Sequence, residues 1–305
     1  MNRPLALALS GGGARGALQV GALRALLEAK IQPDLLVGTS IGAANAAVLA
    51  IRGVATCSIA SLIEDWRAAT AADLLSSNTL RLMIRAMLDH AAHRPDHRLR
   101  DFFIARGLSP DLRFGDIRGV RLIVVATDLN TGRVVLYGPD PRQSVLEGVL
   151  ASTTLPPWMP PLEKEGQLLM DGGIVSNLPI EPAVAAGAAE VIALDLTDPR
   201  GVLTVTNGLG VFLDKLITTV EQRQLALEMT SAAAYGILVR RIPLRVETPM
   251  PIYDFGHTDD LILRGYEITR QAMAHWRPEH LLRRQVRSGE KLESKGYAAP
   301  AMESH

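Results

Sequence analysis

The sequence contains a single cysteine, Cys57, and few aromatic residues. One cysteine excludes a framework of intrachain disulfides and is typical of a reducing compartment, so we expect a cytoplasmic protein in which Cys57 is a small buried residue. Aromatic residues make up 4% of the chain, which leaves little surface for stacking on bases or sugars. The 32 basic residues balance the 32 acidic ones, so no nucleic-acid partner is expected.

Long hydrophobic runs are also absent. The longest stretch without a charged residue, residues 35–51, is 17 residues long, close to the lower limit for a membrane span. It contains glycine, threonine, serine and asparagine, so a buried strand and helix explain it better. The first residues lack the long apolar region of a secretory signal. With 305 residues and 48% hydrophobic content, the chain can bury a substantial core, and we expect a soluble globular protein.

Strand and helix patterns alternate at the start of the chain. The apolar run 5–9 predicts a buried strand, and residues 17–29 carry apolar side chains at helical spacing. Residues 35–37 and 41–51 repeat this order. Such a pattern predicts an α/β fold with a parallel sheet and helices packed on it. Further strands are expected at 121–126, 134–137, 168–170 and 191–196, and further helices at 144–150 and 180–186.

Three later regions have their own character. Residues 58–111 show helical patterns without strands between them and predict a helical insertion that could cover a pocket. Residues 209–227 form an apolar stripe with acidic residues, Glu228 among them, on another face, which predicts an amphipathic helix. We expect this helix to lie on the sheet; a face offered to a membrane or partner is the open alternative. Residues 283–305 are polar and predict a loose C-terminal tail.

A glycine-rich segment, Gly11-Gly-Gly-Ala-Arg-Gly16, follows the first predicted strand and satisfies the pattern G-x-G-x-x-G. Its glycines let backbone N–H groups approach a negative atom at a helix N-terminus. Alone, the pattern fits a dinucleotide-binding turn as well as another anion site. A dinucleotide site requires an acidic residue at the end of the second strand, where this chain has Gly38-Thr39-Ser40. That alternative is therefore disfavoured.

The second predicted strand ends in Gly38-Thr-Ser-Ile-Gly42, a G-x-S-x-G sequence between a strand and a helix. This context is typical of a nucleophile elbow, a sharp turn that lifts the serine hydroxyl above the sheet. Gly38 and Gly42 remove side chains that would crowd Ser40, and the following helix directs its N-terminal dipole towards developing negative charge. Together the two motifs predict a nucleophile, Ser40, beside an oxyanion site.

A serine nucleophile needs a base. Asp171 follows the strand predicted at 168–170, which suits a carboxylate presented at a strand end. Gly172 and Gly173 come next, and they permit an unusual backbone and close approach to another segment. An aspartate in an ordinary turn is the alternative that this motif alone leaves open.

Histidines give the sequence a possible metal site. His90, His93 and His97 have a spacing that could place three imidazoles on one helical face. However, Pro95 would break that helix, and charged residues surround the cluster as on a solvated surface. We therefore expect no metal and no other cofactor, and we assign no role to the remaining histidines.

At these three glycine-containing motifs the sequence resembles a bacterial patatin-like phospholipase. The segments Gly11–Gly16, Gly38–Gly42 and Asp171–Gly173 occur in the order of that family. The resemblance covers residues 4–200 and extends more weakly to about 275. Further segments similar to family signatures are Thr127–Gly132, Ala151–Pro156 and Asn177–Pro179.

The resemblance implies a three-layer α/β/α fold in a domain at 4–275, and hydrolysis of lipid esters by a Ser–Asp dyad without a histidine. Ser40 is then the nucleophile and Asp171 the general base. The implied oxyanion hole consists of backbone N–H groups of Gly11, Gly12, Gly13 and Arg15. The implied partner is a lipid ester or phospholipid, with peripheral membrane contact as a further expectation. A lipid-binding regulatory protein with a vestigial dyad and a nucleotide-binding module remain alternatives.

Overall fold

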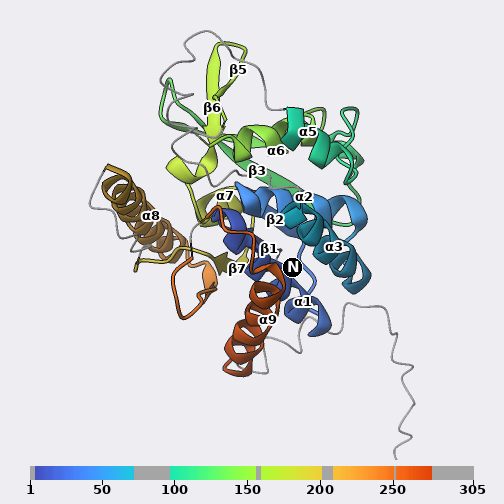
Figure 1. Ribbon diagram of the computed structural model, residues 1–305, viewed down its shortest axis with the longest axis vertical. Helices are drawn as coiled ribbons and strands as arrows, with labels where there is room; N and C mark the ends of the chain where they lie inside the picture. The colour runs from blue at the N-terminus through green and yellow to red at the C-terminus, as the bar shows by residue number, and fades with distance from the viewer. Residues whose placement is uncertain (1–3, 72–96, 156–158, 201–208, 251, 277–305) are drawn as a thin grey trace, which may run out of the picture.

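The computed structural model describes residues 4–71, 97–155, 159–200, 209–250 and 252–276. In this part of the chain an eight-stranded sheet lies between helices (Figure 1). The strand order is β5-β6-β3-β2-β1-β7-β8, and β4 also pairs with β3. The strands are β1 (Leu5–Leu9), β2 (Leu35–Thr39), β3 (Arg121–Asp128), β4 (Arg133–Tyr137), β5 (Leu162–Lys164), β6 (Gln167–Asp171), β7 (Glu190–Asp195) and β8 (Leu238–Pro243).

The strands β3, β2, β1, β7 and β8 are parallel to one another, whereas β4 and β6 pair antiparallel with β3, and β5 pairs antiparallel with β6. The described helices connect or flank these strands. They are α1 (Gly16–Glu28), α2 (Ile41–Arg52), α3 (Thr56–Ala71), α5 (His97–Ile104), α6 (Val145–Thr153), α7 (Ile180–Ala185), α8 (Leu209–Ala234) and α9 (Thr258–Ala274), with short 3₁₀ turns η1 (Gly13–Arg15), η2 (Phe114–Asp116) and η3 (Gly172–Ile174).

The central strands are buried on both faces, as their continuous apolar runs predict. Because successive side chains of a strand point to opposite faces, Leu7 and Leu9 of β1 enter one core cluster, and Ala6 and Ala8 enter another. The first cluster also contains buried residues of α1, α2, α3, α6 and α9. The second contains residues of α7 and α8. Helices therefore cover both faces, and the three-layer α/β/α fold with a mostly parallel sheet is confirmed.

The elements predicted up to residue 196 lie within three residues of the observed ones, and the helix predicted at 209–227 continues to Ala234 as α8. The strands β5 and β8 and the helix α9 were not predicted. The predicted insertion at 58–111 contains α5 and most of α3, and its middle, 72–96, lies outside the described residues. The predicted tail at 283–305 lies outside them as well. The expectation that Cys57 is buried is wrong, because it lies in the first turn of α3 and is exposed.

Helix α8 lies at one side of the molecule, on the left in Figure 1. The predicted orientation of its apolar and polar faces is wrong. Apolar side chains at positions 216, 217, 220 and 227 are 41–52% exposed, whereas Glu228 is 5% exposed. The side chain expected on the polar face is thus buried, because it finds hydrogen-bond partners inside. None of the helices within the described ranges is both long enough and apolar enough to cross a membrane.

Candidate active site

Ser40 stands in the sharp turn between β2 and α2. Its φ of 55° and ψ of −127° belong to a conformation that non-glycine residues rarely adopt. The flanking glycines permit close contacts. A Cβ atom on Gly38 would lie 2.6 Å from the Cα of Ala43, and one on Gly42 would lie 2.3 Å from the carbonyl oxygen of Leu9. The G-x-S-x-G segment therefore forms the strained elbow that its pattern predicts.

Asp171, the last residue of β6, reaches the elbow across one intervening strand. It pairs with Ala126 of β3, and Thr39 at the end of β2 pairs with the adjacent Val125. The two strands therefore end at the same level on either side of β3. Gly172 allows the chain to turn there, since a Cβ atom on it would lie 2.4 Å from the carbonyl oxygen of Val125.

The carboxyl group of Asp171 is buried against the Ser40 side chain. The residue is 4% exposed, and its Oδ1 accepts a 2.8 Å hydrogen bond from the N–H of Gly173. Burial raises the pKa of Asp171 from 3.8 to about 6, and the hydrogen bonds from the Ser40 side chain and Gly173 oppose this rise. A carboxyl group with such a pKa can take up and return a proton near neutral pH, as a general base must.

The glycine-rich loop approaches Ser40 through Gly11, where an added Cβ atom would lie 3.1 Å from the Cβ of Ser40. Among the hydrogen bonds of the described residues, the N–H groups of Gly12 and Gly13 have no acceptor. In contrast, the N–H of Gly11 donates to the carbonyl oxygen of Asn177 at 3.1 Å, and that of Arg15 donates to the carbonyl oxygen of Gly12 at 3.2 Å. Of the four predicted oxyanion donors, two therefore have N–H groups without an acceptor in the described chain, Gly12 and Gly13, whereas the amides of Gly11 and Arg15 already donate to carbonyl groups.

Ile252 supports this loop from a distant part of the sequence. Its carbonyl oxygen accepts a 2.6 Å hydrogen bond from the N–H of Ala14. The same oxygen lies 2.2 Å from the position of a Cβ atom on Gly13, whose φ is 56°. Sequence reasoning missed Ile252, since a contact made by a carbonyl group leaves no signal in residue type.

Ser152 of α6 fixes the backbone of the elbow. Its buried hydroxyl accepts a 2.8 Å hydrogen bond from the N–H of Ser40 and donates a 2.6 Å bond to the carbonyl oxygen of Val125. One signal in the sequence marks this residue, namely its place in the segment Ala151–Pro156 that resembles a family signature. It gave no signal for its role.

Asn177 joins the glycine-rich loop to the segment that follows β6. Its side-chain oxygen lies 2.5 Å from the position of a Cβ atom on Gly11 and 3.1 Å from that on Gly173. One residue earlier, the carbonyl oxygen of Ser176 accepts a 2.8 Å hydrogen bond from the hydroxyl of Thr39. The three predicted motifs are therefore brought together in one contiguous site.

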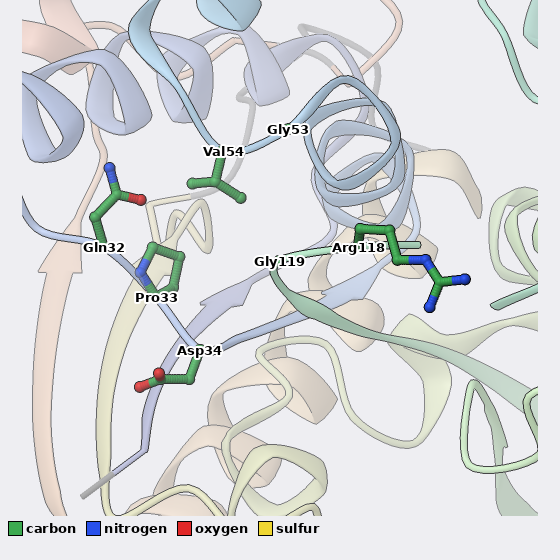
Figure 2. A pocket seen from close by; sticks show the side chains of 7 residues that line it. All are labelled: Gln32, Pro33, Asp34, Gly53, Val54, Arg118 and Gly119. Atoms are coloured by element: carbon green, nitrogen blue, oxygen red, sulfur yellow. The ribbon is translucent and has the colours of Figure 1, made fainter. Parts of the chain in front are cut away.

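A cavity of about 350 Å³ lies elsewhere, at the opposite ends of the strands (Figure 2). Asp34, on its wall, directly precedes β2, whereas Ser40 follows that strand. The cavity is therefore separate from the dyad. Its lining residues are Gln32, Pro33, Asp34, Gly53, Val54, Arg118 and Gly119.

Among the described histidine side chains, His257 contacts Asp254 and His275 contacts Gln271. His90 and His93 fall outside the described residues, and His97 begins α5. Nε2 of His257 lies 3.9 Å from Oδ2 of Asp254, and this histidine side chain is 58% exposed. Over the described ranges, no three histidine, cysteine or acidic residues gather as metal ligands would.

Comparison with protein families agrees with this geometry. The sequence model described as patatin-like phospholipase matches residues 7–184, more than half of the chain. The chain belongs to the patatin-like phospholipase family. The matched region contains Ser40, Asp171 and the glycine-rich loop, so the family predicted from the three motifs is confirmed.

Relatives in this family are much longer proteins. The chain is 31% identical over 290 residues to patatin-like phospholipase domain-containing protein 7 of Rattus norvegicus, covering 86% of this chain and 20% of that protein. It is 26% identical to lysophospholipase nte1 of Aspergillus terreus, covering 98% of this chain and 20% of that one. The chain thus spans about a fifth of their length. Among solved structures, VipD from Legionella pneumophila shares the fold, with a TM-score of 0.50, 16% identity, and coverage of 90% of this chain and 67% of that one.

Proposed function

We propose that this chain is a serine acyl hydrolase that cleaves carboxylic esters of lipids. The observation that carries the proposal is the position of the Ser40 side chain, at a strained turn, against the buried carboxyl group of Asp171. The N–H groups of Gly12 and Gly13, which lack an acceptor within the described chain, complete the arrangement. It supplies a nucleophile, a base and charge stabilisation in one place.

The reaction would proceed through an acyl-enzyme. The hydroxyl oxygen of Ser40 attacks the ester carbonyl carbon while its proton moves to Asp171. The N–H groups of Gly12 and Gly13 donate to the oxyanion of the tetrahedral intermediate. Collapse breaks the bond to the alcohol, which takes the proton from Asp171 and leaves an ester on Ser40. Water then attacks this ester, with Asp171 accepting and returning its proton, and the carboxylic acid is released.

Lipid esters are the substrate class that the family favours. The family carries the description phospholipase, and the relative from Aspergillus terreus is named a lysophospholipase. Hydrolysis of p-nitrophenyl esters of increasing chain length, assayed beside phospholipid vesicles, tests the proposal. We expect turnover that rises with acyl length and survives dialysis against EDTA. A protein that binds vesicles without hydrolysing any ester would support the vestigial dyad, and saturable nucleotide binding would support the nucleotide-binding alternative.

We further propose that α8 contacts the surface of the lipid substrate. Leu216, Val220 and Leu227 recur at helical spacing on its exposed side, and the exposed side chains of Lys215 and Arg223 lie on the same helix. Apolar residues flanked by cations suit the boundary between lipid headgroups and acyl chains of an anionic membrane. The inner side of α8 contacts the segment after Asp171, so this helix links the exposed surface to the segment that follows the proposed base.

Vesicle flotation with Leu227→Asp tests this membrane contact. We expect weaker binding to vesicles that contain anionic phospholipid, with unchanged hydrolysis of a short soluble ester. Leu263→Asp is the matched control, because Leu263 is an equally apolar side chain, 59% exposed, on α9. Equal binding of the two variants and the unaltered protein would contradict the proposed contact.

A further inference from the structure

Glu228 is a buried acidic residue that the proposed reaction does not use. It is 5% exposed on α8, and its Oε1 accepts a 2.6 Å hydrogen bond from the hydroxyl of Ser176. Its Oε2 accepts bonds of 2.6 Å and 3.1 Å from the N–H groups of Ile180 and Glu181. A carboxyl group is costly to bury, so these three donors explain why this side of α8 turns inwards.

Gln224 lies one turn earlier on the same side of α8 and contacts the same segment. Its side-chain amide donates to the carbonyl oxygen of Ile174, and its Oε1 accepts a 3.3 Å bond from the N–H of Asn177. Glu228 and Gln224 together thus bind four backbone groups and one hydroxyl between residues 174 and 181.

The segment 174–181 contacts the neighbours of both dyad residues and the glycine-rich loop. It begins directly after the turn at Asp171. The carbonyl oxygen of Ser176 accepts a hydrogen bond from the hydroxyl of Thr39, the residue before Ser40. The carbonyl oxygen of Asn177 accepts a hydrogen bond from the N–H of Gly11. A shift of this segment would therefore move the base, the nucleophile and the glycine-rich loop relative to one another.

We infer that Glu228 and Gln224 are positioning residues, which hold the segment 174–181 so that Asp171 and Ser40 keep their reactive geometry. This inference rests on the proposed function. It assigns to α8 a role in catalysis that acts through the loop and not through contact with the ester. Burial raises the pKa of Glu228 from 4.5 to about 7. A neutral side chain of the same shape can still accept from Ile180 and Glu181 while donating to the Ser176 hydroxyl, so the contacts do not depend on the charge.

The test compares Glu228→Ala with Glu228→Gln. Glutamine keeps an oxygen for the N–H groups of Ile180 and Glu181, and its amide can donate to the Ser176 hydroxyl, which can also act as an acceptor. Alanine leaves all three groups unpaired. The control is Met229→Ala, because Met229 packs from the same helix against the second core cluster, where truncation loosens α8 without removing the hydrogen bonds of Glu228 and Gln224.

The readouts are kcat and KM for a short soluble ester and the rate of Ser40 labelling by a fluorophosphonate, at a temperature well below each melting midpoint. We expect Glu228→Ala to lower kcat and labelling about tenfold or more with little change in KM, since misplacement by about 1 Å can cost about 100-fold. Glu228→Gln should restore most of both, and Met229→Ala should keep both. If Glu228→Ala does not fold, Gln224→Ala serves in its place, because Gln224 is only half-buried.

The possible outcomes separate this inference from the proposed function. If the unaltered protein neither reacts with the probe nor hydrolyses esters, the proposed function fails and the inference fails with it. If the unaltered protein is active and Glu228→Ala keeps its labelling rate, the inference alone fails. An equal loss in Met229→Ala at matched thermal stability would also overturn it, because general loosening of α8 would then explain the effect.

Discussion

The backbone N–H of Ser40 donates a 2.8 Å hydrogen bond to the hydroxyl of Ser152. That hydroxyl donates its own hydrogen bond to the carbonyl oxygen of Val125, 2.6 Å away on β3. One buried side chain therefore ties the elbow to the strand that also pairs with Asp171. The strained conformation of Ser40 persists because its surroundings enforce it, and Ser152 is a principal part of them.

Replacing Ser152 with alanine should reduce kcat for a soluble ester about tenfold, because displacement of a reacting group by about 1 Å can cost about 100-fold. It should also destabilise the fold by about 1–3 kcal/mol, since a buried N–H and a buried carbonyl lose their partner. Steady-state kinetics and thermal denaturation measure the two effects. The control is Thr153→Ala, because the Thr153 hydroxyl bonds only within its own helix. Unchanged kcat in Ser152→Ala would show that the turn at Ser40 keeps its conformation without the hydrogen bonds of Ser152.

Gly13→Ala should remove most activity. The new Cβ atom would meet the carbonyl oxygen of Ile252 at 2.2 Å, so the loop must move and displace its N–H groups. Loss of one oxyanion donor typically lowers kcat by about 10²–10³. Gly166→Ala is the control, since Gly166 also has a positive φ, 79°, but open space around it. A folded Gly13→Ala protein with nearly full kcat would mean that the glycines serve only the turn.

The dyad is distinguished from a serine–histidine–aspartate triad by a substitution panel. Asp171→Asn should nearly eliminate hydrolysis, because an amide cannot accept the proton of Ser40. His257→Ala, and alanine at every other histidine, should leave measurable kcat. The exposed ring of His257 contacts Asp254 rather than the dyad. A folded histidine variant that loses as much activity as Asp171→Asn while still binding substrate would replace the dyad with a triad.

The pH dependence of kcat/KM should report the carboxyl group of Asp171. Only the ionised form accepts a proton, and burial raises the pKa of Asp171 to about 6, so activity should fall as the pH drops below about 6. Glu228 is a second buried carboxyl group with a raised pKa. The profile is therefore measured in both the unaltered protein and Glu228→Gln, where the limb that remains belongs to Asp171. A remaining midpoint near the ordinary aspartate value of about 4 would contradict burial of the base.

Much of the fold could be predicted because the central strands are continuous apolar runs. Apolar runs that stop at glycines marked β1 and β2, and the motifs at their ends placed Ser40 beside the glycine-rich loop. Parallel strands present their carboxyl ends at one edge of a sheet, so this neighbourhood follows from local sequence alone. The short β5 and the later β8, which contains two arginines, carry weaker strand patterns and were missed. Helix α9 was missed although its apolar residues recur at helical spacing.

The remaining site residues depend on long-range packing that periodicity does not reveal. Helix α8 is an example, because Glu228 was predicted on its exposed polar face and is buried instead. The side chain points inwards because Ser176 and the start of α7 supply hydrogen-bond donors. Nothing in the helix itself records those partners. Likewise, the carbonyl oxygen of Asn177 accepts a hydrogen bond from the N–H of Gly11. The glycine-rich loop could therefore be predicted from the sequence, but which of its N–H groups lack an acceptor could not.

Covalent labelling of Ser40 tests the central claim most directly. A fluorophosphonate reacts with a serine only where the hydroxyl is activated and an oxyanion site receives the phosphoryl oxygen, so it requires the whole arrangement at once. The labelled protein is digested and the modified peptide identified by mass spectrometry, beside Ser40→Ala and Asp171→Asn. We predict one label on Ser40 in the unaltered protein, none in Ser40→Ala, and strongly slowed labelling in Asp171→Asn. Labelling that persists unchanged in Ser40→Ala would contradict the account.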